Sequence, residues 1–341
     1  MKRCTHEALS RPSPGRHPDR CRLQQPAPAE KPAEPPKPAW TGDQSAQKYK
    51  DCWDQFNRKD WTAFRSCYGP AITVEAVDSG RPVVSGLDAA VKDAQDFVAA
   101  FPDVTGSVQL VLASKDSVAG LAVVSGTHGG PLPGPDGKPI AATNKKVGYM
   151  MGLVVDLADG AVVKERQYAD NTTMLAQIGV IKAPTRPLMT GGAPAPTVVI
   201  STGSDTERAA VDTFRANMAA FNAHDQKTLA AMNAADGVFH DYTQAKDMTS
   251  ADNITGLVQL FKGFPDAMLE AASMWGAGDY VVTEGTFSGT NKGAVPMMGI
   301  KKPTGKTAKV RFLEITKIEA GKIEEDWLVF DSMAFAAQLG L

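Results

Sequence analysis

Two aspartates of this chain stand where side chains could carry out proton transfer. Asp170 and Asp331 are equivalent in two segments, 160–179 and 321–340, that align without a gap. Each follows a segment with strand character and precedes a short segment with helical character. A partly desolvated carboxyl group has a raised pKa that suits general acid or base catalysis. The alternative for Asp331 and for Asp170 is that the carboxylate caps the following helix, and the two roles are compatible.

The residues before these aspartates define a candidate pocket wall. Side chains alternate along a strand, so residues two and four positions before an aspartate share its face. If the aspartates face a pocket, the same pocket is expected to be lined by Trp327 and Val329 beside Asp331, and by Arg166 and Tyr168 beside Asp170.

His240 is a further candidate, because a histidine titrates near neutral pH and can pass on a proton. It lies in a short predicted strand beside Tyr242, and the family resemblance given below implies that this strand borders the pocket. The alternative is an exposed strand histidine. Arg311 is expected either to pair with a strand carboxylate, such as Glu284 or Glu314, or to bind an acidic ligand.

The repeated segments belong to a longer internal repeat, which predicts two copies of one domain. In each copy, helical periodicity comes first, then Phe-Pro-Asp at 101–103 or 264–266, then a run of strands. This order is typical of α+β domains. The predicted organisation is a disordered Pro-rich tail (1–41), a first domain (42–182), a linker (183–204) and a second domain (205–341).

The second copy carries several short motifs in a recognisable order. They are Phe264-Pro265-Asp266, Glu284-Gly285-Thr286, Pro303-Thr304-Gly305-Lys306, Gly321-Lys322-Ile323, Asp331 and Gln338-Leu339-Gly340. Together they resemble the SnoaL-like polyketide cyclases of the nuclear transport factor/ketosteroid isomerase superfamily. The resemblance implies two tandem cone-shaped half-barrels, each a curved, mostly antiparallel sheet covered by about three helices.

The resemblance also implies a function. In the cyclases the aspartate at the position of Asp331 acts as general acid and base in an aldol closure. The histidine that assists there is replaced here by Lys317 and Asp156. We expect aldol cyclisation, isomerisation or hydrolysis of a small hydrophobic carbonyl compound, using Asp331. The alternative is a non-catalytic module that binds a small ligand or a protein.

Domains of this family commonly dimerise, so the two copies are expected to form an intrachain pseudo-dimer. The formal net charge of −2 gives no basic footprint for nucleic acid. No apolar run reaches the roughly 20 residues of a membrane-spanning helix. The histidines form no ligand pairs and no Gly-rich phosphate loop occurs, so neither a metal nor another cofactor is expected.

The N-terminal residues and the cysteines bear on the compartment. Residues 1–40 lack the apolar segment of a signal peptide, which predicts a cytoplasmic protein. The alternative is an exported protein or a periplasmic lipoprotein anchored at Cys21, if the N-terminus is mis-assigned. Cys52 and Cys67 are expected to be two buried free thiols, whereas a disulfide between them would favour export.

Overall fold

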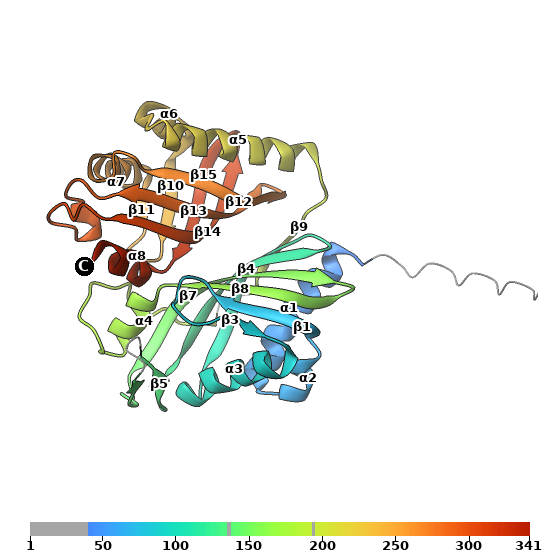
Figure 1. The fold of residues 1–341 in the computed structure, drawn as a ribbon. Coiled ribbons are helices and arrows are strands. Elements are labelled where there is room, and N and C mark those ends of the chain that lie inside the picture. Colours follow the sequence, from blue (N-terminus) through green and yellow to red (C-terminus); the bar gives the residue numbers. More distant parts are fainter. Residues whose placement is uncertain (1–39, 135–137, 193–194) are drawn as a thin grey trace, which may run out of the picture. The chain divides into compact units, whose positions relative to one another are not determined.

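The computed structural model describes residues 40–134, 138–192 and 195–341. The predicted Pro-rich tail, apart from Trp40 and Thr41, lies outside the described residues. Each repeat forms a curved, unclosed sheet with helices packed against it, as Figure 1 shows. The predicted α+β class with two tandem half-barrels is therefore confirmed. The repeats are called copy one and copy two below.

Copy one begins with helices and continues as a strand meander. Its helices are α1 (Gly42–Arg58), α2 (Trp61–Arg65), α3 (Leu87–Ala100) and α4 (Asn171–Gln177). Its strands are β1 (Tyr68–Ala76), β2 (Val84–Ser85), β3 (Thr105–Ala113), β4 (Ser117–Thr127), β5 (Leu132–Pro133), β6 (Pro139–Ile140), β7 (Lys146–Ala158) and β8 (Ala161–Ala169).

Copy two repeats this order. Its helices are α5 (Asp205–Asn222), α6 (Gln226–Met232), α7 (Ser250–Gly263), the short 3₁₀ helix η1 (Pro296–Met298) and α8 (Ser332–Leu339). Its strands are β10 (Asn233–Asp241), β11 (Met248–Thr249), β12 (Met268–Ala277), β13 (Tyr280–Thr290), β14 (Thr307–Glu319) and β15 (Lys322–Phe330).

The two main sheets have the same topology. Copy one has the strand order β2-β1-β8-β7-β4-β3-β9, and copy two has the order β11-β10-β15-β14-β13-β12. Most pairs are antiparallel, but the first long strand of each copy pairs in parallel with the last, β1 with β8 and β10 with β15. The extra strand β9 (Thr197–Ile200) comes from the segment predicted as linker and pairs in parallel with β3.

Local signals in the sequence explain where several helices begin and end. Asp60 and Asp225 cap α2 and α6 by accepting hydrogen bonds from the backbone N–H groups three residues later. Gly340 ends α8 in the left-handed conformation, which glycine adopts without strain. Thr249 caps α7 by accepting a hydrogen bond from the N–H group of Asp252.

The two copies share one apolar cluster. It includes Leu121 and Val154 of copy one together with Leu313, Ile315 and Val329 of copy two, all nearly inaccessible to solvent. Copy one also has its own clusters, and so does copy two. One face of each sheet is therefore covered by the other copy. The cavities described below lie on the other side of each sheet.

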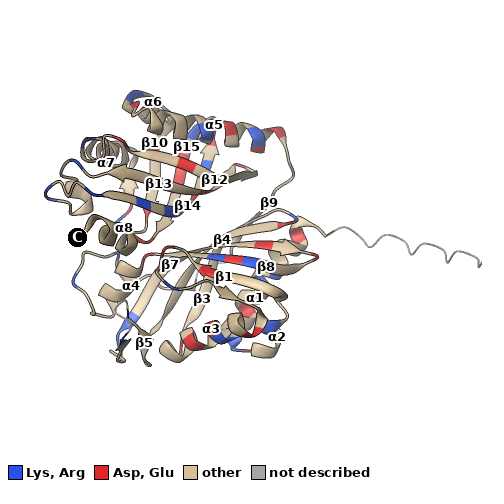
Figure 2. Cartoon of the chain, viewed as in Figure 1, with Lys and Arg blue, Asp and Glu red and all other residues tan. Residues whose placement is uncertain are grey.

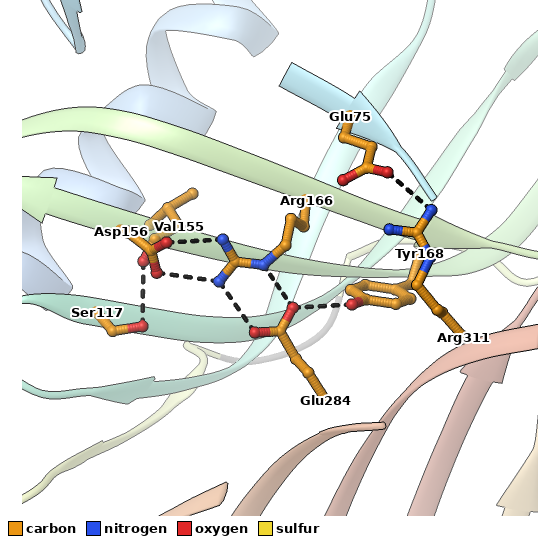
Figure 3. Close-up of polar contacts among 8 residues, drawn as sticks. All are labelled: Glu75, Ser117, Val155, Asp156, Arg166, Tyr168, Glu284 and Arg311. Atoms are coloured by element: carbon orange, nitrogen blue, oxygen red, sulfur yellow. Dashed lines mark hydrogen bonds and ion pairs between the residues drawn. The ribbon is translucent and has the colours of Figure 1, made fainter. Parts of the chain in front are cut away.

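A buried ion pair crosses this shared cluster (Figure 3). Glu284 of β13 accepts hydrogen bonds from Arg166 of β8, at 2.5 Å from Nε and 2.9 Å from Nη2, and from the hydroxyl group of Tyr168 at 2.8 Å. Arg166 also binds Asp156, so its guanidinium group joins two carboxylates. Both side chains of the Arg166–Glu284 pair are about nine-tenths buried.

Charged residues are otherwise interspersed over both copies. Figure 2 shows basic and acidic residues scattered among each other on the helices and strands, in keeping with the net charge of −2. No helix of the described residues is long and apolar enough to span a membrane.

The expected free thiols are corrected by the structure, which joins Cys52 and Cys67 in a disulfide. Cys52 lies on α1 and Cys67 directly precedes β1. The turn between α1 and α2 brings their Cα atoms to 5.9 Å, within the range that a disulfide spans.

The Arg166–Glu284 pair predicts a specific loss of stability. Glu284→Gln should lower the free energy of unfolding by about 3 kcal/mol, because it leaves Arg166 and Tyr168 buried without their shared acceptor charge. Urea titration measures this. The matched control is Glu319→Gln, which removes a half-exposed partner of Lys317 and should cost less than about 1 kcal/mol. Equal losses for the two variants would contradict a stabilising role for the pair.

The disulfide predicts sensitivity to reductant. It closes a loop of 15 residues, so its reduction should lower the free energy of unfolding by about 3 kcal/mol. The measurement is urea unfolding with and without dithiothreitol. The Cys52→Ser/Cys67→Ser variant should match the reduced protein under both conditions. An unchanged midpoint on reduction of the wild-type protein would show that the bond contributes nothing.

Candidate functional site

Copy one contains the larger of the two cavities described here, with a volume of about 700 Å³. This lies within the range of small-molecule sites in proteins. Its walls include residues of α1, α2, α3, α4 and the inner face of the sheet, and they are mainly apolar. The aromatic residues in this wall include Trp53, Phe56, Phe64, Phe97 and Tyr149. The cavity therefore suits an apolar molecule of moderate size.

Glu165 places a buried carboxyl group in this cavity. It accepts hydrogen bonds from the hydroxyl group of Tyr68 at 2.9 Å and from Nε2 of Gln167 at 2.6 Å. Burial raises the pKa of Glu165, and the charge of Asp93 adds to this, although the two hydrogen bonds favour the ionised form. Glu165 can therefore keep its proton at a higher pH than an exposed glutamate.

Asp331 also places a carboxyl group in the lining of the copy-one cavity, although it belongs to copy two. The remaining carboxyl groups of this lining are those of Asp78, Asp93 and Asp96. One oxygen caps α8 by accepting from the N–H group of Met333 at 2.9 Å. The other accepts from Nδ2 of Asn171 in copy one at 2.6 Å. Burial raises the pKa of Asp331 to about 6, and the charge of Asp170 also raises it. The hydrogen bonds from Asn171 and Met333 act in the opposite direction, because they stabilise the ionised carboxylate. Such a group exchanges protons near neutral pH.

Asp170 makes the corresponding contacts from the other side. One oxygen caps α4 through the N–H group of Thr173 at 3.0 Å. The other accepts from the N–H and hydroxyl groups of Ser332, at 3.0 and 2.6 Å. Each aspartate thus caps its own helix and binds the residue that follows the other aspartate. Unlike Asp331, Asp170 is not part of the lining of either cavity described here.

Copy two encloses a smaller cavity of about 200 Å³. Its walls are rich in phenylalanine, including Phe214, Phe221, Phe239, Phe287, Phe312, Phe330 and Phe335. The ionisable residues in its lining are Asp241, Glu314 and Asp326. This cavity is therefore also apolar, with an acidic group on one side.

Glu314 and Asp326 form a pair of carboxyl groups on β14 and β15. Asp326 accepts a hydrogen bond from the hydroxyl group of Thr316 at 2.7 Å. Burial raises the pKa of Asp326 to about 7, and the charge of Asp241 adds to it. Burial, together with the charge of Asp326, also raises the pKa of Glu314 well above the ordinary value. Two interacting acids of this kind hold a proton at a pH at which either acid alone would be ionised.

The six residues predicted to line a pocket lie in the contact between the copies. Arg166 and Tyr168 bind Glu284, and Arg311 binds Glu75 and Asp78 of copy one, as Figure 3 shows in part. Tyr242 and Val329 belong to the shared apolar cluster, and Trp327 packs against it. Neither of the two cavity linings includes any of the six.

Strand alternation accounts for this placement. On β15, Trp327 and Val329 share a face, as predicted, but Asp326, Leu328 and Phe330 form the face that lines the copy-two cavity. Asp331 lies beyond the strand, at the first turn of α8, so the face of the strand does not determine where its side chain points.

His240 also lies away from both linings. Its ring nitrogens are 2.9 Å from Asp247 and 3.0 Å from Glu325, and the ring stacks on Trp327 and Tyr242. Burial disfavours the charged imidazolium, but the hydrogen bonds and charges of the two carboxylates outweigh it and raise the pKa of His240. The side chain therefore favours the charged form in an ion-paired cluster.

Glu165 and Asp326 were not identified from the sequence as site residues. The gap-free alignment places both five residues after the first glycine of their segments, Gly160 and Gly321. An acid at this position in both copies is a usable signal, although a search for identical residues misses it. In the part of the chain that the structure describes, no group of three or more His, Cys, Asp or Glu residues could hold a metal ion.

The carboxyl pair predicts how stability depends on pH. Because the pKa of Asp326 is raised from 3.8 to about 7, the folded protein holds a proton that the unfolded chain releases. This contribution is complete below about pH 4 and is lost as the pH rises through about 7. The free energy of unfolding of the wild-type protein should therefore fall by a few kcal/mol over this range relative to Asp326→Asn.

Urea titrations between about pH 4.5 and about pH 7.5 measure this difference. The control is Asp205→Asn, which changes an almost fully exposed carboxylate and should keep the pH dependence of the wild-type protein. A parallel pH profile for Asp326→Asn and the wild-type protein would contradict the raised pKa.

Comparison with known proteins gives a family and several structural neighbours. Residues 43–178 and 211–339 match the family described as SnoaL-like polyketide cyclase. No curated protein matches. AclR from Streptomyces galilaeus is 22% identical and covers 42% of this chain and 100% of its own, with a TM-score of 0.36. IdmH from Streptomyces antibioticus is 25% identical and covers 40% of this chain and 99% of its own, with a TM-score of 0.35.

Proposed function

Because this chain belongs to the SnoaL-like polyketide cyclase family, we propose that its copy-one cavity binds a small hydrophobic carbonyl compound and that Asp331 transfers a proton to or from it. The observation that carries this proposal is the position of Asp331. Its carboxyl group lies in the lining of a mainly apolar cavity of about 700 Å³ and has a pKa of about 6. Few aspartates exchange protons so close to neutral pH.

The proposed chemistry uses Asp331 and Glu165, two of the five acids in the lining of this cavity, in different roles. The ionised Asp331 removes a proton from the carbon beside the carbonyl group, and the electron pair of that C–H bond forms the enolate. Glu165, which holds its proton more firmly than an exposed glutamate, donates a hydrogen bond to the developing oxyanion. Protonated Asp331 then returns the proton to the alkoxide of an aldol product or to carbon in an isomerisation.

The family's cyclase chemistry depends on a histidine on a late strand, whose place is taken here by Lys317 and Asp156. Asp156 binds Arg166 at the contact between the copies, away from the copy-one lining. Asp331 and Glu165 are therefore the proposed proton-transfer groups, and the reaction is described as proton transfer rather than as one named cyclisation.

The second candidate function is binding without catalysis. It is favoured by the hydrogen bonds of Asp331, both of whose oxygens already serve the structure, one as the cap of α8 and one as the acceptor of Asn171. In this alternative the pKa of Asp331 is raised by burial and by the charge of Asp170 without any catalytic role, and the cavity stores or carries an apolar molecule.

Two further proposals concern assembly and compartment. The reciprocal contacts of Asp170 with Ser332 and of Asp331 with Asn171 support an intrachain pseudo-dimer, because a two-fold arrangement exchanges each contact with its counterpart. The Cys52–Cys67 disulfide supports export over the cytoplasm, since disulfides persist mainly in oxidising compartments.

The catalytic proposal predicts different behaviour for two matched variants. Asn caps helices about as well as Asp, so Asp331→Asn and Asp170→Asn should both fold. In a thermal-shift screen of small cyclic and aliphatic ketones, both should bind the compounds that stabilise the wild-type protein. Asp331→Asn should lose about 100-fold or more in turnover of such a ketone, because it cannot exchange a proton.

Asp170→Asn is the control, since Asp170 is the cap of copy one and lies outside both linings. It should retain turnover within a few-fold. Turnover measured by solvent deuterium exchange at the carbon beside the carbonyl group tests the proton step directly. If ketones bind the wild-type protein but show no deuterium exchange, the catalytic proposal is contradicted and the non-catalytic binding function is favoured.

A further inference from the structure

We infer that Met333 of copy two sets the upper size limit of the ligand held by copy one. This inference rests on the proposed function, in which the copy-one cavity is the ligand site. The lining of that cavity includes Met333, Ala334 and Ala337 in addition to Asp331, all from α8 of copy two. The site is therefore incomplete without the second copy.

Helix α8 presents a different face to each copy. Phe335 lines the copy-two cavity, and Leu339, one turn later, is buried in the core of the same copy. Met333, Ala334 and Ala337 lie on the other side of the helix and line the copy-one cavity. Met333 packs against the apolar cluster that contains Phe64, Tyr149 and Leu175 of copy one. One short helix thus forms part of the wall of both cavities.

Met333 is the long side chain among the residues that α8 contributes to copy one. Its neighbours in the wall, Ala334 and Ala337, end at Cβ and therefore extend less far into the cavity than Met333 does. Methionine is unbranched and flexible, so it fills irregular space and adapts to what lies against it. The position of the Met333 side chain therefore determines how far a ligand can extend toward copy two.

The corresponding position in copy one has a different residue, and this explains why the arrangement is not reciprocal. The repeat alignment pairs Met333 with Thr172. Thr172 is short, and its hydroxyl group is 2.8 Å from the hydroxyl group of Ser332 at the contact between the copies. The lining of the copy-two cavity contains no residue of α4 among those that the structure describes. Copy two therefore closes the cavity of copy one, whereas copy one leaves that of copy two unaffected.

The test uses 4-alkylacetophenones with alkyl chains of increasing length. Burial of each additional methylene should tighten binding about fourfold while the cavity has room for it. In the wild-type protein the gain should stop at the chain length that reaches Met333. Met333→Thr installs the residue of the equivalent position, and its affinities should keep rising for at least two more methylenes. Met333→Phe should stop the gain at a shorter chain.

The matched control is Met268→Thr, which makes the same change at an exposed site on β12 outside both linings. Its size limit should equal that of the wild-type protein. Calorimetric titration of the full chain gives the dissociation constants. If Met333→Thr does not fold, Met333→Phe still tests the inference in the opposite direction.

The outcomes separate this inference from the function on which it rests. A limit that moves up in Met333→Thr or down in Met333→Phe supports the inference. Binding with an unchanged limit in the Met333 variants overturns it and leaves the proposed ligand site in place. If no acetophenone of the series binds to any of the proteins, both the proposed ligand site and the inference are overturned.

Discussion

A buried ion pair between the copies determines which face of each sheet is available to a ligand. Glu284 accepts from Arg166 and Tyr168 within an apolar cluster that both sheets share. A charged pair that is about nine-tenths buried is stable only while its partners stay together, since an isolated buried charge is costly. One face of each sheet is therefore buried against the other copy, and the cavities form on the opposite side of each sheet.

The contact between the copies also explains why the two repeated aspartates have different surroundings. Asp170 and Asp331 look alike in the sequence, and both cap a helix at the meeting point of the copies. They differ in what surrounds them. Asp331 lies against the copy-one cavity, where burial raises its pKa to about 6, while Asp170 lies outside both linings. Duplication followed by small changes near the contact can thus leave one copy with a composite site.

Much of the fold could be predicted because its signals are local. The caps at Asp60 and Asp225, the C-terminal glycine of α8 and the order of helices and strands each depend on a few neighbouring residues. The face of each strand that lines a cavity could not be predicted, because alternation groups Trp327 with Val329 without showing what covers them. Strand β9 depends on its pairing with the distant strand β3, and the disulfide depends on how closely α1 approaches the start of β1; spacing along the chain reveals neither.

The central claim is that copy two completes the cavity of copy one, and labelled methionine methyl groups test it most directly. Met151 and Met174 of copy one line this cavity together with Met333, whereas Met297 and Met298 line the cavity of copy two. Titration of the ¹³C-methyl-methionine protein with acetophenone, followed by NMR, should shift the resonances of Met151, Met174 and Met333 together. Shifts of Met151 and Met174 without Met333 would show that copy one binds the ketone without help from copy two, which contradicts the account.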